Sequence, residues 1–259
     1  MNKLDAVAVK NAYDSYFCFN NERTLSTAVP SQLQIVDEDS FTAYIDPTRR
    51  YDNQINIRAT QRKPPLIGEL LEYYSDDMPP EIRIDSDTVP SFCHTLPKYE
   101  YEVSYTQEFM FMTQADYMHR QLDGQVVVEV WGEDRADDFL NLLKTSGMDC
   151  DEQVWQAKRK YYCTQTFRCY VAFIDNAPCA WATTFLDGSI ATLANAYTQE
   201  QYRNQGCQTA LLQARIVDAF ESGIQYLLTD VLINTPSSRN CKSAGFSTIN
   251  LCDVWEKQR

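Results

Sequence analysis

The segment best suited to chemistry is residues 198–212, TQEQYRNQGCQTALL. An apolar strand pattern ends here, a short polar turn follows, and a helix begins with small and polar residues. The first backbone N–H groups of a helix have no partner within it and lie at the positive end of the helix dipole, so this junction suits an anion, above all a pyrophosphate. Arg203 adds a charge that pairs with phosphate oxygens, and Gly206 allows the backbone to approach a ligand closely.

The segment also fits a plainer interpretation. An ordinary connection from a strand to a helix contains such residues too, with Gly206 only easing the turn, because a single glycine is a weak motif.

Residues 202–212 resemble the acetyl-CoA-binding motif R/Q-x-x-G-x-G/A of the GNAT superfamily of N-acetyltransferases. Arg203 and Gly206 match the first two positions of that motif. Gln208 departs from the third, where Gly or Ala is usual. The main-chain donors remain in spite of this departure, and the Gln208 side chain can itself bond a phosphate.

A second segment, NTPSSRNCKSAGF at residues 234–246, resembles the later motif of the same family, N-x-x-A-x-x-x-Y-x-x-x-G-F. Ser237 replaces the small residue, and Cys241 stands where the family usually has a tyrosine. Two motifs in this order, with a predicted strand between them, are stronger than either alone, and the resemblance covers about residues 126–259. The matching positions are Asn234, Gly245 and Phe246.

The resemblance implies a site for acetyl-CoA as co-substrate, with no metal. In the family, the strand before the first motif splays from its neighbour and receives the pantetheine arm, and residues 191–198 take that place here. The residues assigned to coenzyme binding in this way are Ala196, Tyr197, Thr198, Arg203, Asn204, Gln205, Gly206, Cys207, Gln208, Thr209, Asn234, Ser237 and Asn240.

The implied reaction is direct attack of an amine on the thioester, with a backbone N–H among residues 196–198 as donor to the thioester oxygen. Cys241 is the candidate general acid, because a thiol with a pKa of about 8.5 can protonate a thiolate. The alternatives for the general acid are Tyr197, another tyrosine or water. Cys241 can also be interpreted as a small buried residue without a catalytic role.

The general base is sought among carboxylates, tyrosines and water, since both histidines, His94 and His119, precede the resembling region. Asp230, at the end of a predicted strand, and Glu200, near the phosphate turn, are the candidates. Each also fits a solvated or capping residue.

Composition narrows the class of protein. The chain has 259 residues, of which 44% are apolar, and a net charge of −13, so we expect a folded protein that repels nucleic acid and favours a cationic partner such as an amine. Without a run of about 18 apolar residues or a signal-peptide pattern, we expect no membrane span and a cytoplasmic location. The nine cysteines are odd in number and scattered, which indicates free thiols.

Hydrophobic periodicity in the second half predicts the order βααβββαβαβ. The fold class is α/β (α+β): a mixed, mostly antiparallel central sheet flanked by helices, similar to the GNAT fold. The predicted strands are residues 126–130, 168–174, 179–185, 190–197, 226–231 and a last strand through 254, and the predicted helices are 134–145, 151–162, 206–221 and 237–243.

A boundary near residues 118–124 predicts two regions, 1–120 and the acetyl-CoA-binding catalytic region 121–259. The first region is predicted to contain a helix at 2–18, irregular chain at 20–60, a helix at 66–74 and strands at 81–84 and 99–111. The last three resemble the latter half of the second region. We therefore favour a degenerate copy of the same fold over an unrelated cap that shapes the acceptor pocket.

The leading function is transfer of an acetyl group to a small-molecule amine or a peptide amino group. The missing tyrosine and the departure at Gln208 favour an alternative, a CoA-binding regulatory or scaffold protein without turnover. A third hypothesis is an interaction module whose first 120 residues dock a partner. The acceptor pocket is built by variable loops, so the motifs alone do not identify the amine.

Overall fold

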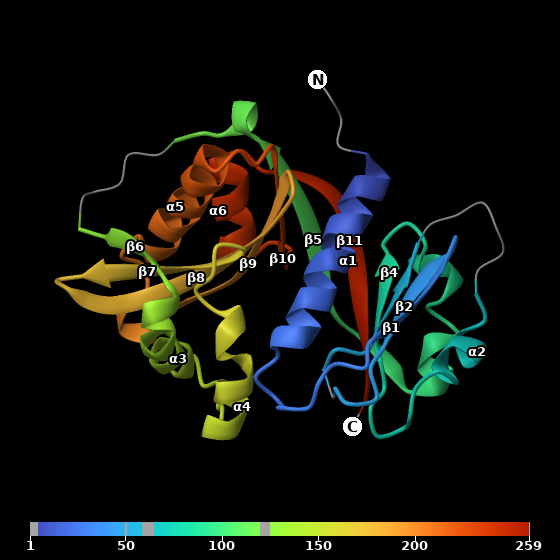
Figure 1. Cartoon of the computed structure of the whole chain (residues 1–259). Coiled ribbons are helices and arrows are strands. Elements are labelled where there is room, and N and C mark those ends of the chain that lie inside the picture. The colour runs from blue at the N-terminus through green and yellow to red at the C-terminus, as the bar shows by residue number, and fades with distance from the viewer. Residues whose placement is uncertain (1–4, 50, 59–64, 120–124, 259) are drawn as a thin grey trace. The chain divides into compact units, whose positions relative to one another are not determined.

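The structure, a computed structural model, describes residues 5–49, 51–58, 65–119 and 125–258 (Figure 1). The boundary expected at 118–124 falls largely on residues 120–124, which lie outside the described residues. The chain forms two compact units. Unit 1 comprises the chain up to Ala28, Met110–Asp230 and Pro236–Ser247, and unit 2 comprises Val29–Phe109, Val231–Thr235 and the residues from Thr248 onward.

Unit 1 contains a sheet in the order β10-β9-β8-β7-β6. Strands β6 to β9 are antiparallel to their neighbours, whereas β10 is parallel to β9. The order predicted from residue 126 onward is confirmed, with ends that differ by a few residues. The elements are α1 (Ala6–Arg23), β6 (Val127–Trp131), α3 (Ala136–Lys144), α4 (Glu152–Lys158), β7 (Phe167–Ile174), β8 (Ala177–Asp187), β9 (Ile190–Thr198), α5 (Cys207–Glu221), β10 (Tyr226–Leu232, to Asp230 in this unit) and α6 (Pro236–Ala244).

The hairpin of β7 and β8 turns at Asp175 and Asn176, residue types that favour tight turns. Asp175 and Asn176 have φ values of 50° and 62°, the left-handed conformation that a two-residue hairpin turn requires. In β7, Val171 and Ala172 point to opposite faces and both are fully buried. This strand is therefore covered on both sides.

Helices cover the two faces of the unit 1 sheet (Figure 1). On one face, α5 packs against β7, β8 and β9 around Tyr170, Ala182 and Leu211. On the other face, α3 and α4 enclose a larger core that contains Phe139, Trp155 and further buried side chains of the sheet.

Helix α1 belongs to unit 1 although it lies at the start of the chain. It packs on β8 and β9, where the ring of Phe19 stacks on that of Phe185 with centroids 4.6 Å apart. Its last turn is held by the buried Arg23, which donates to the Tyr162 hydroxyl at 3.0 Å, and by Lys158, which donates to the Glu22 carbonyl at 2.7 Å. The expected helix over 2–18 thus begins after its N-cap Asp5 and continues to Arg23, while residues 1–4 lie outside the described residues.

In unit 2 the strands lie in the order β1-β2-β3-β4-β11-β5. After the antiparallel strands β1 to β3 comes the helix α2, and β4 then lies parallel to β3. The β8-β9-α5-β10 segment of unit 1 has the same sequence of pairings. The elements are β1 (Gln34–Glu38), β2 (Phe41–Ile45), β3 (Gln54–Ile57), α2 (Ile67–Leu71), β4 (Glu81–Asp85), β5 (Tyr101–Thr113, to Phe109 in this unit) and β11 (Ser247–Lys257, from Thr248).

The expectation of irregular chain at residues 20–60 is wrong for part of that stretch, which contains the end of α1 and three strands. Ile55 and Ile57 are fully buried in β3, and the polar residues around them have structural partners. Asn53, for example, accepts from the Asp46 N–H and donates to the Arg49 carbonyl, both at 2.8 Å. The polar composition of this stretch therefore favoured a prediction of irregular chain. In the structure, these polar side chains stabilise the connection between two strands.

Within the described part of the chain, no helix is long and apolar enough to cross a bilayer. Among the described residues, none of the nine cysteines forms a disulfide.

Candidate functional site

The centre of the candidate site is the point where β9 continues beyond its parallel partner. Residues 226–229 of β10 pair with residues 190–193 of β9, and this register ends at Thr229 opposite Leu193. On its other side β9 stays paired with β8 as far as Thr198. Asn195 and Ala196 are exposed, whereas Leu193 is buried, as is usual for a central strand. The chain beyond Leu193 is therefore exposed at Asn195 and Ala196, whereas Thr198 is 8% exposed.

Alternate backbone groups of this part of β9 point away from β8. Gln199 N–H donates to the Cys179 carbonyl at 3.0 Å, which makes this a hydrogen-bonded pair of the antiparallel ladder. Because such pairs alternate with non-bonded ones, Ala196 and Thr198, opposite Ala182 and Ala180, direct their N–H and C=O groups away from β8. The N–H groups of these two residues are therefore directed toward the edge of β9 that is not paired with β8, where they can donate to a ligand.

A bulge in β9 precedes these groups. Ala196 pairs with Ala182, and Leu193 pairs with Thr184, so two residues of β9 stand opposite the single residue Thr183. A bulge of this kind shifts which backbone groups face each side of a strand. Both carbonyls of the bulge accept side-chain hydrogen bonds, that of Ala194 from Arg215 at 3.4 Å and that of Asn195 from Thr183 at 3.5 Å.

The turn before α5 forms a cradle at the N-terminus of a long helix. Gly206 is the N-cap, with φ of 83°, and α5 then runs for 15 residues. A Cβ at this position would have no described heavy atom within 4 Å, so the glycine is required by its left-handed backbone and leaves open space beside the first helical N–H groups. These groups fit a pyrophosphate. Arg203, 55% exposed, lies nearby along the chain and forms a loose ion pair with Glu200 at 3.5 Å.

The other residues expected at this turn divide into two kinds. Gln208 donates from Nε2 to the Thr198 hydroxyl at 2.7 Å, so its side chain ties α5 to the end of β9. Cys207 is buried, with its sulfur 3.5 Å from that of Cys179. The remaining positions of the turn are exposed or partly so, and they are Asn204, Gln205 and Thr209.

In α6, the structure places the expected residues on different sides of the helix. Ser237 is exposed and Asn240 is partly exposed, whereas Cys241 is 6% exposed. Cys241 interacts electrostatically with Arg215 of α5. Gly245 is needed where it stands, because a Cβ there would collide with the carbonyl oxygen of Asp116.

Two expected residues lie around β10. Asp230 directly follows Thr229 in this strand and is partly exposed. Asn234 lies in the turn after β10, has φ of 62° and belongs to unit 2.

Sequence reasoning missed Tyr13 and Arg215. The Tyr13 hydroxyl, from α1, donates to the Thr229 carbonyl at 3.3 Å, at the last paired residue of β10. No local pattern predicts which strand α1 covers. Arg215 did carry a signal, since it is a charged residue on the apolar side of α5, next to Leu211 and Ile216.

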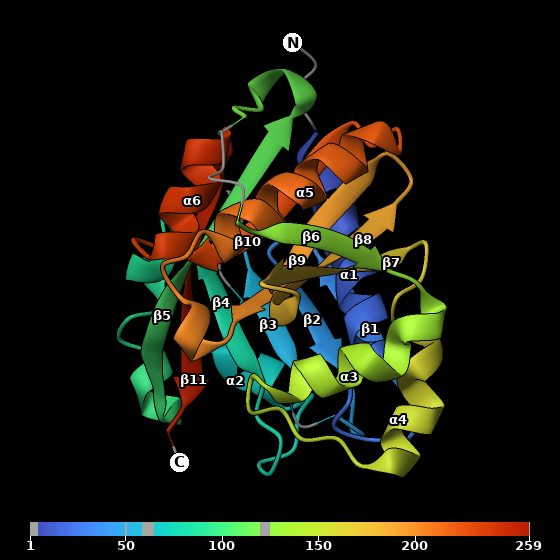
Figure 2. The ribbon, with the colours of Figure 1, turned by 90° about the vertical axis from the view of Figure 1, so that its left-hand side faces the viewer.

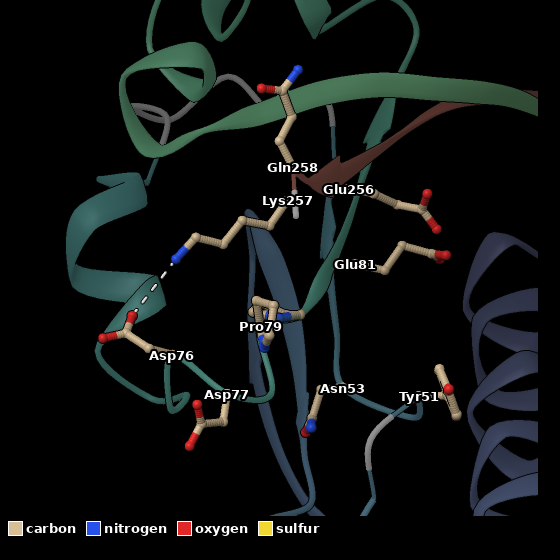
Figure 3. Close-up of a pocket in the computed structure, with 10 residues that line it drawn as sticks. Tyr51, Asn53, Asp76, Asp77, Pro79, Glu81, Glu256, Lys257 and Gln258 are labelled. Carbon is tan, nitrogen blue, oxygen red and sulfur yellow. Dashed lines mark ion pairs between the residues drawn. The ribbon is translucent and has the colours of Figure 1, made fainter.

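A separate open pocket in unit 2 has a volume of about 720 Å³ (Figure 3). Four carboxylates line it, and two of them have cationic partners: Asp76 pairs with Lys257 at 3.6 Å, and Glu81 pairs with Arg83 at 2.5 Å. We therefore place the candidate site in unit 1. Figure 2 shows α5 crossing the strands of this unit on the face turned to the viewer.

The comparisons with known proteins concern the family and the fold. The family model described as "Acetyltransferase (GNAT) family" matches residues 131–246. Among solved structures, the chain is similar to a GCN5-related N-acetyltransferase from Kribbella flavida (TM-score 0.66, 11% identity, covering 99% of this chain and 97% of that one). No curated protein matches.

Two further solved structures show the same fold. One is a GCN5-related N-acetyltransferase from Sphaerobacter thermophilus (TM-score 0.61, 12% identity, covering 85% of this chain and 81% of that one). The other is a tandem GNAT protein from the clavulanic acid biosynthesis pathway (TM-score 0.54, 11% identity, covering 95% and 94%). Residues 131–246, which contain the part of β9 beyond Leu193 and the cradle before α5, form an acetyltransferase domain of the GNAT family.

Proposed function

We propose that unit 1 transfers an acetyl group from acetyl-CoA to a primary amine. The observation that carries this proposal is the continuation of β9 beyond Thr229, next to the cradle at Gly206. One feature suits an extended amide chain and the other suits a diphosphate, and acetyl-CoA contains both in that order.

Each part of the coenzyme has residues that fit it. The N–H groups at the start of α5 and the charge of Arg203 would hold the diphosphate, and the outward N–H and C=O groups of Ala196 and Thr198 would pair with the pantetheine amides. Tyr197 lies between them, with its ring 6.2 Å from that of Trp181. We assign Ser237 and Asn240 of α6, which are exposed and partly exposed, to the same coenzyme on the resemblance alone.

The chemistry is attack by the amine nitrogen on the thioester carbonyl, which forms a C–N bond and breaks the C–S bond. An outward N–H of β9 would donate to the carbonyl oxygen, where negative charge develops. The nitrogen must lose one proton and the leaving sulfur must gain one. Asp230 is proposed to accept the first and Cys241 to supply the second.

The acceptor is proposed to approach on the face of the sheet that carries α1. Tyr13 reaches the last pair of the β9–β10 register from this face, and its oxygen has lone pairs that can accept from an amine N–H. A net charge of −13 favours a cationic amine at longer range. Either a small amine or a peptide amino group satisfies this chemistry.

The test is CoA release from acetyl-CoA with a panel of amines and N-terminal peptides. CoA is measured by chromatography, since a thiol reagent would also react with the protein's nine cysteines. We expect amine-dependent release and a product heavier than the amine by one acetyl group. Binding of acetyl-CoA without release by any amine would contradict the transferase assignment and favour the alternative, a CoA-binding regulatory protein.

We also infer that unit 2 is a degenerate copy of the same fold. Its antiparallel strands, short helix α2 and parallel strand β4 repeat the pairing pattern of unit 1. We also propose that the protein is located in the cytoplasm.

A further inference from the structure

Arg215 is a buried charge with no carboxylate partner among the described residues. Arg215 is 5% exposed and lies in the middle of α5. Within the described part of the chain it takes part in no ion pair, and its hydrogen bonds go to the carbonyls of Leu211, Thr183 and Ala194, each at 3.4 Å. Burying an unpaired charge is costly, so a residue of this kind requires a reason other than packing.

The acceptors of Arg215 identify that reason. Thr183 is the single residue of β8 opposite the bulge, and Ala194 is the first of the two bulge residues of β9. One nitrogen, Nη1, bonds both carbonyls, while Nε is tied to the carbonyl one helical turn earlier in α5. The guanidinium therefore joins both strands to the helix at the bulge itself.

The bulge decides which backbone groups face the open edge. A strand alternates with a period of two, so the one extra residue reverses the parity of every group that follows it. With the bulge, the N–H groups of Ala196 and Thr198 point away from β8. Without the bulge, the residues next to Ala196 and Thr198 would direct their N–H groups away from β8. The N–H group of Ala196 would then point toward β8.

We propose that Arg215 is a positioning residue that holds the bulge of β9, and through it the N–H groups that receive the thioester and the pantetheine arm. The expected effect on kcat rests on the proposed acyl transfer. The expected effect on the bulge does not. The planar guanidinium suits the task because its several donors are held in a fixed arrangement, whereas a lysine ammonium lacks the Nε–H that anchors the side chain to α5.

The electrostatics of the site are consistent with this role. Burial lowers the pKa of Arg215 to about 10, and the groups that oppose this shift are Cys241 of α6 and Tyr170 of β7. The side chain therefore keeps its charge at neutral pH. That charge lies beside Cys241, the proposed proton donor.

The test compares Arg215→Met and Arg215→Lys with a matched control, Arg168→Met. Arg168 also joins the sheet to α5, through an ion pair with Asp218 at 2.6 Å, and its side chain donates hydrogen bonds to Asp218 and Ser222 at that end of the helix. The measurements are hydrogen–deuterium exchange of the peptide that covers residues 190–198, the Kd for acetyl-CoA by calorimetry, and kcat and KM with an accepted amine.

For Arg215→Met we expect exchange at residues 194–198 to rise at least about tenfold and kcat to fall roughly 10- to 100-fold. This is less than the roughly 100- to 1,000-fold that removal of one oxyanion donor costs, because the backbone N–H would be displaced and not removed. Arg215→Lys should recover part of both, and Arg168→Met should change neither by more than about twofold. If Arg215→Met does not fold, Arg215→Lys is measured alone against wild type, with the same direction expected.

Exchange and kcat within about twofold of wild type in both Arg215 variants would overturn the inference. Failure of the proposed function is distinguishable, because it would appear as wild-type protein that releases no CoA, while the exchange measurement would still test the hold on the bulge.

Discussion

The hydroxyl of Tyr13 donates to the carbonyl of Thr229 across 3.3 Å. Thr229 is the last residue of β10 paired with β9, and its own hydroxyl donates to the Leu193 carbonyl at 3.0 Å. Helix α1 therefore places the hydroxyl of Tyr13 at the point where β9 and β10 stop pairing.

Tyr13→Phe should reduce transfer without unfolding the protein. The loss of one hydrogen bond costs about 0.5–1.5 kcal/mol, and the ring remains to pack. If the phenol oxygen orients the amine, KM for the amine should rise or kcat should fall by roughly tenfold, with the Kd for acetyl-CoA unchanged. Tyr161→Phe is the control, since its hydroxyl contacts Glu22 away from β10. Equal kinetics for Tyr13→Phe and wild type would rule out this role for Tyr13.

Arg23 should be needed for the docking of α1. Its guanidinium lies 4.5 Å from the centroid of Phe167 and donates to Tyr162, in a fully buried setting. Arg23→Met should lower the free energy of unfolding by roughly 1–3 kcal/mol, measured by urea titration. Arg135→Met removes a similar contact, 4.1 Å from the centroid of Trp131, on an exposed side chain, and should cost under about 1 kcal/mol. Equal losses for the two variants would contradict this assignment.

The second half of the fold was predictable because its periodicities are strong and its turns carry specific residues. Asp175 and Asn176, residue types that favour tight turns, connect the strands predicted at 168–174 and 179–185, and Gly206 has a left-handed backbone at the predicted turn before the helix. The strands at 34–57 were missed because their burial depends on tertiary partners, as the contacts of Asn53 show. Tyr13 could not be placed for the same reason, since its acceptor is 216 residues away.

Cys179 should resist alkylation although it lies beside Cys207. Burial, with a smaller contribution from Cys207, raises the pKa of the Cys179 thiol from 9.0 to about 12. At pH 8 the thiolate fraction is on the order of 10⁻⁴, so iodoacetamide should modify the partly exposed Cys18 and Cys93 first, as mass spectrometry of digested protein can show. Modification of Cys179 as fast as of Cys93 would contradict the burial.

The same shift predicts a dependence of stability on pH. A thiol whose pKa is raised by folding stays protonated in the folded state while the unfolded state ionises. Its contribution to the free energy of unfolding is fully present below pH 9.0 and is lost as the pH rises to about 12. Cys179→Ala should flatten this part of the stability curve, measured by urea titration at pH 8 and pH 10. An unchanged slope in Cys179→Ala would assign the loss to other groups.

Gly206 carries the central claim, because φ of 83° at this position shapes the cradle before α5. Calorimetric titration of acetyl-CoA into wild type, Gly206→Val and Gly147→Val tests it most directly. Gly147 is the matched control: it has φ of 86° and equally open surroundings among the described residues, but it lies outside the site. We predict saturable binding to wild type and to Gly147→Val, and loss of binding in Gly206→Val. Wild-type protein that binds no acetyl-CoA at millimolar concentration, or Gly206→Val that binds it as tightly as wild type, would contradict the account.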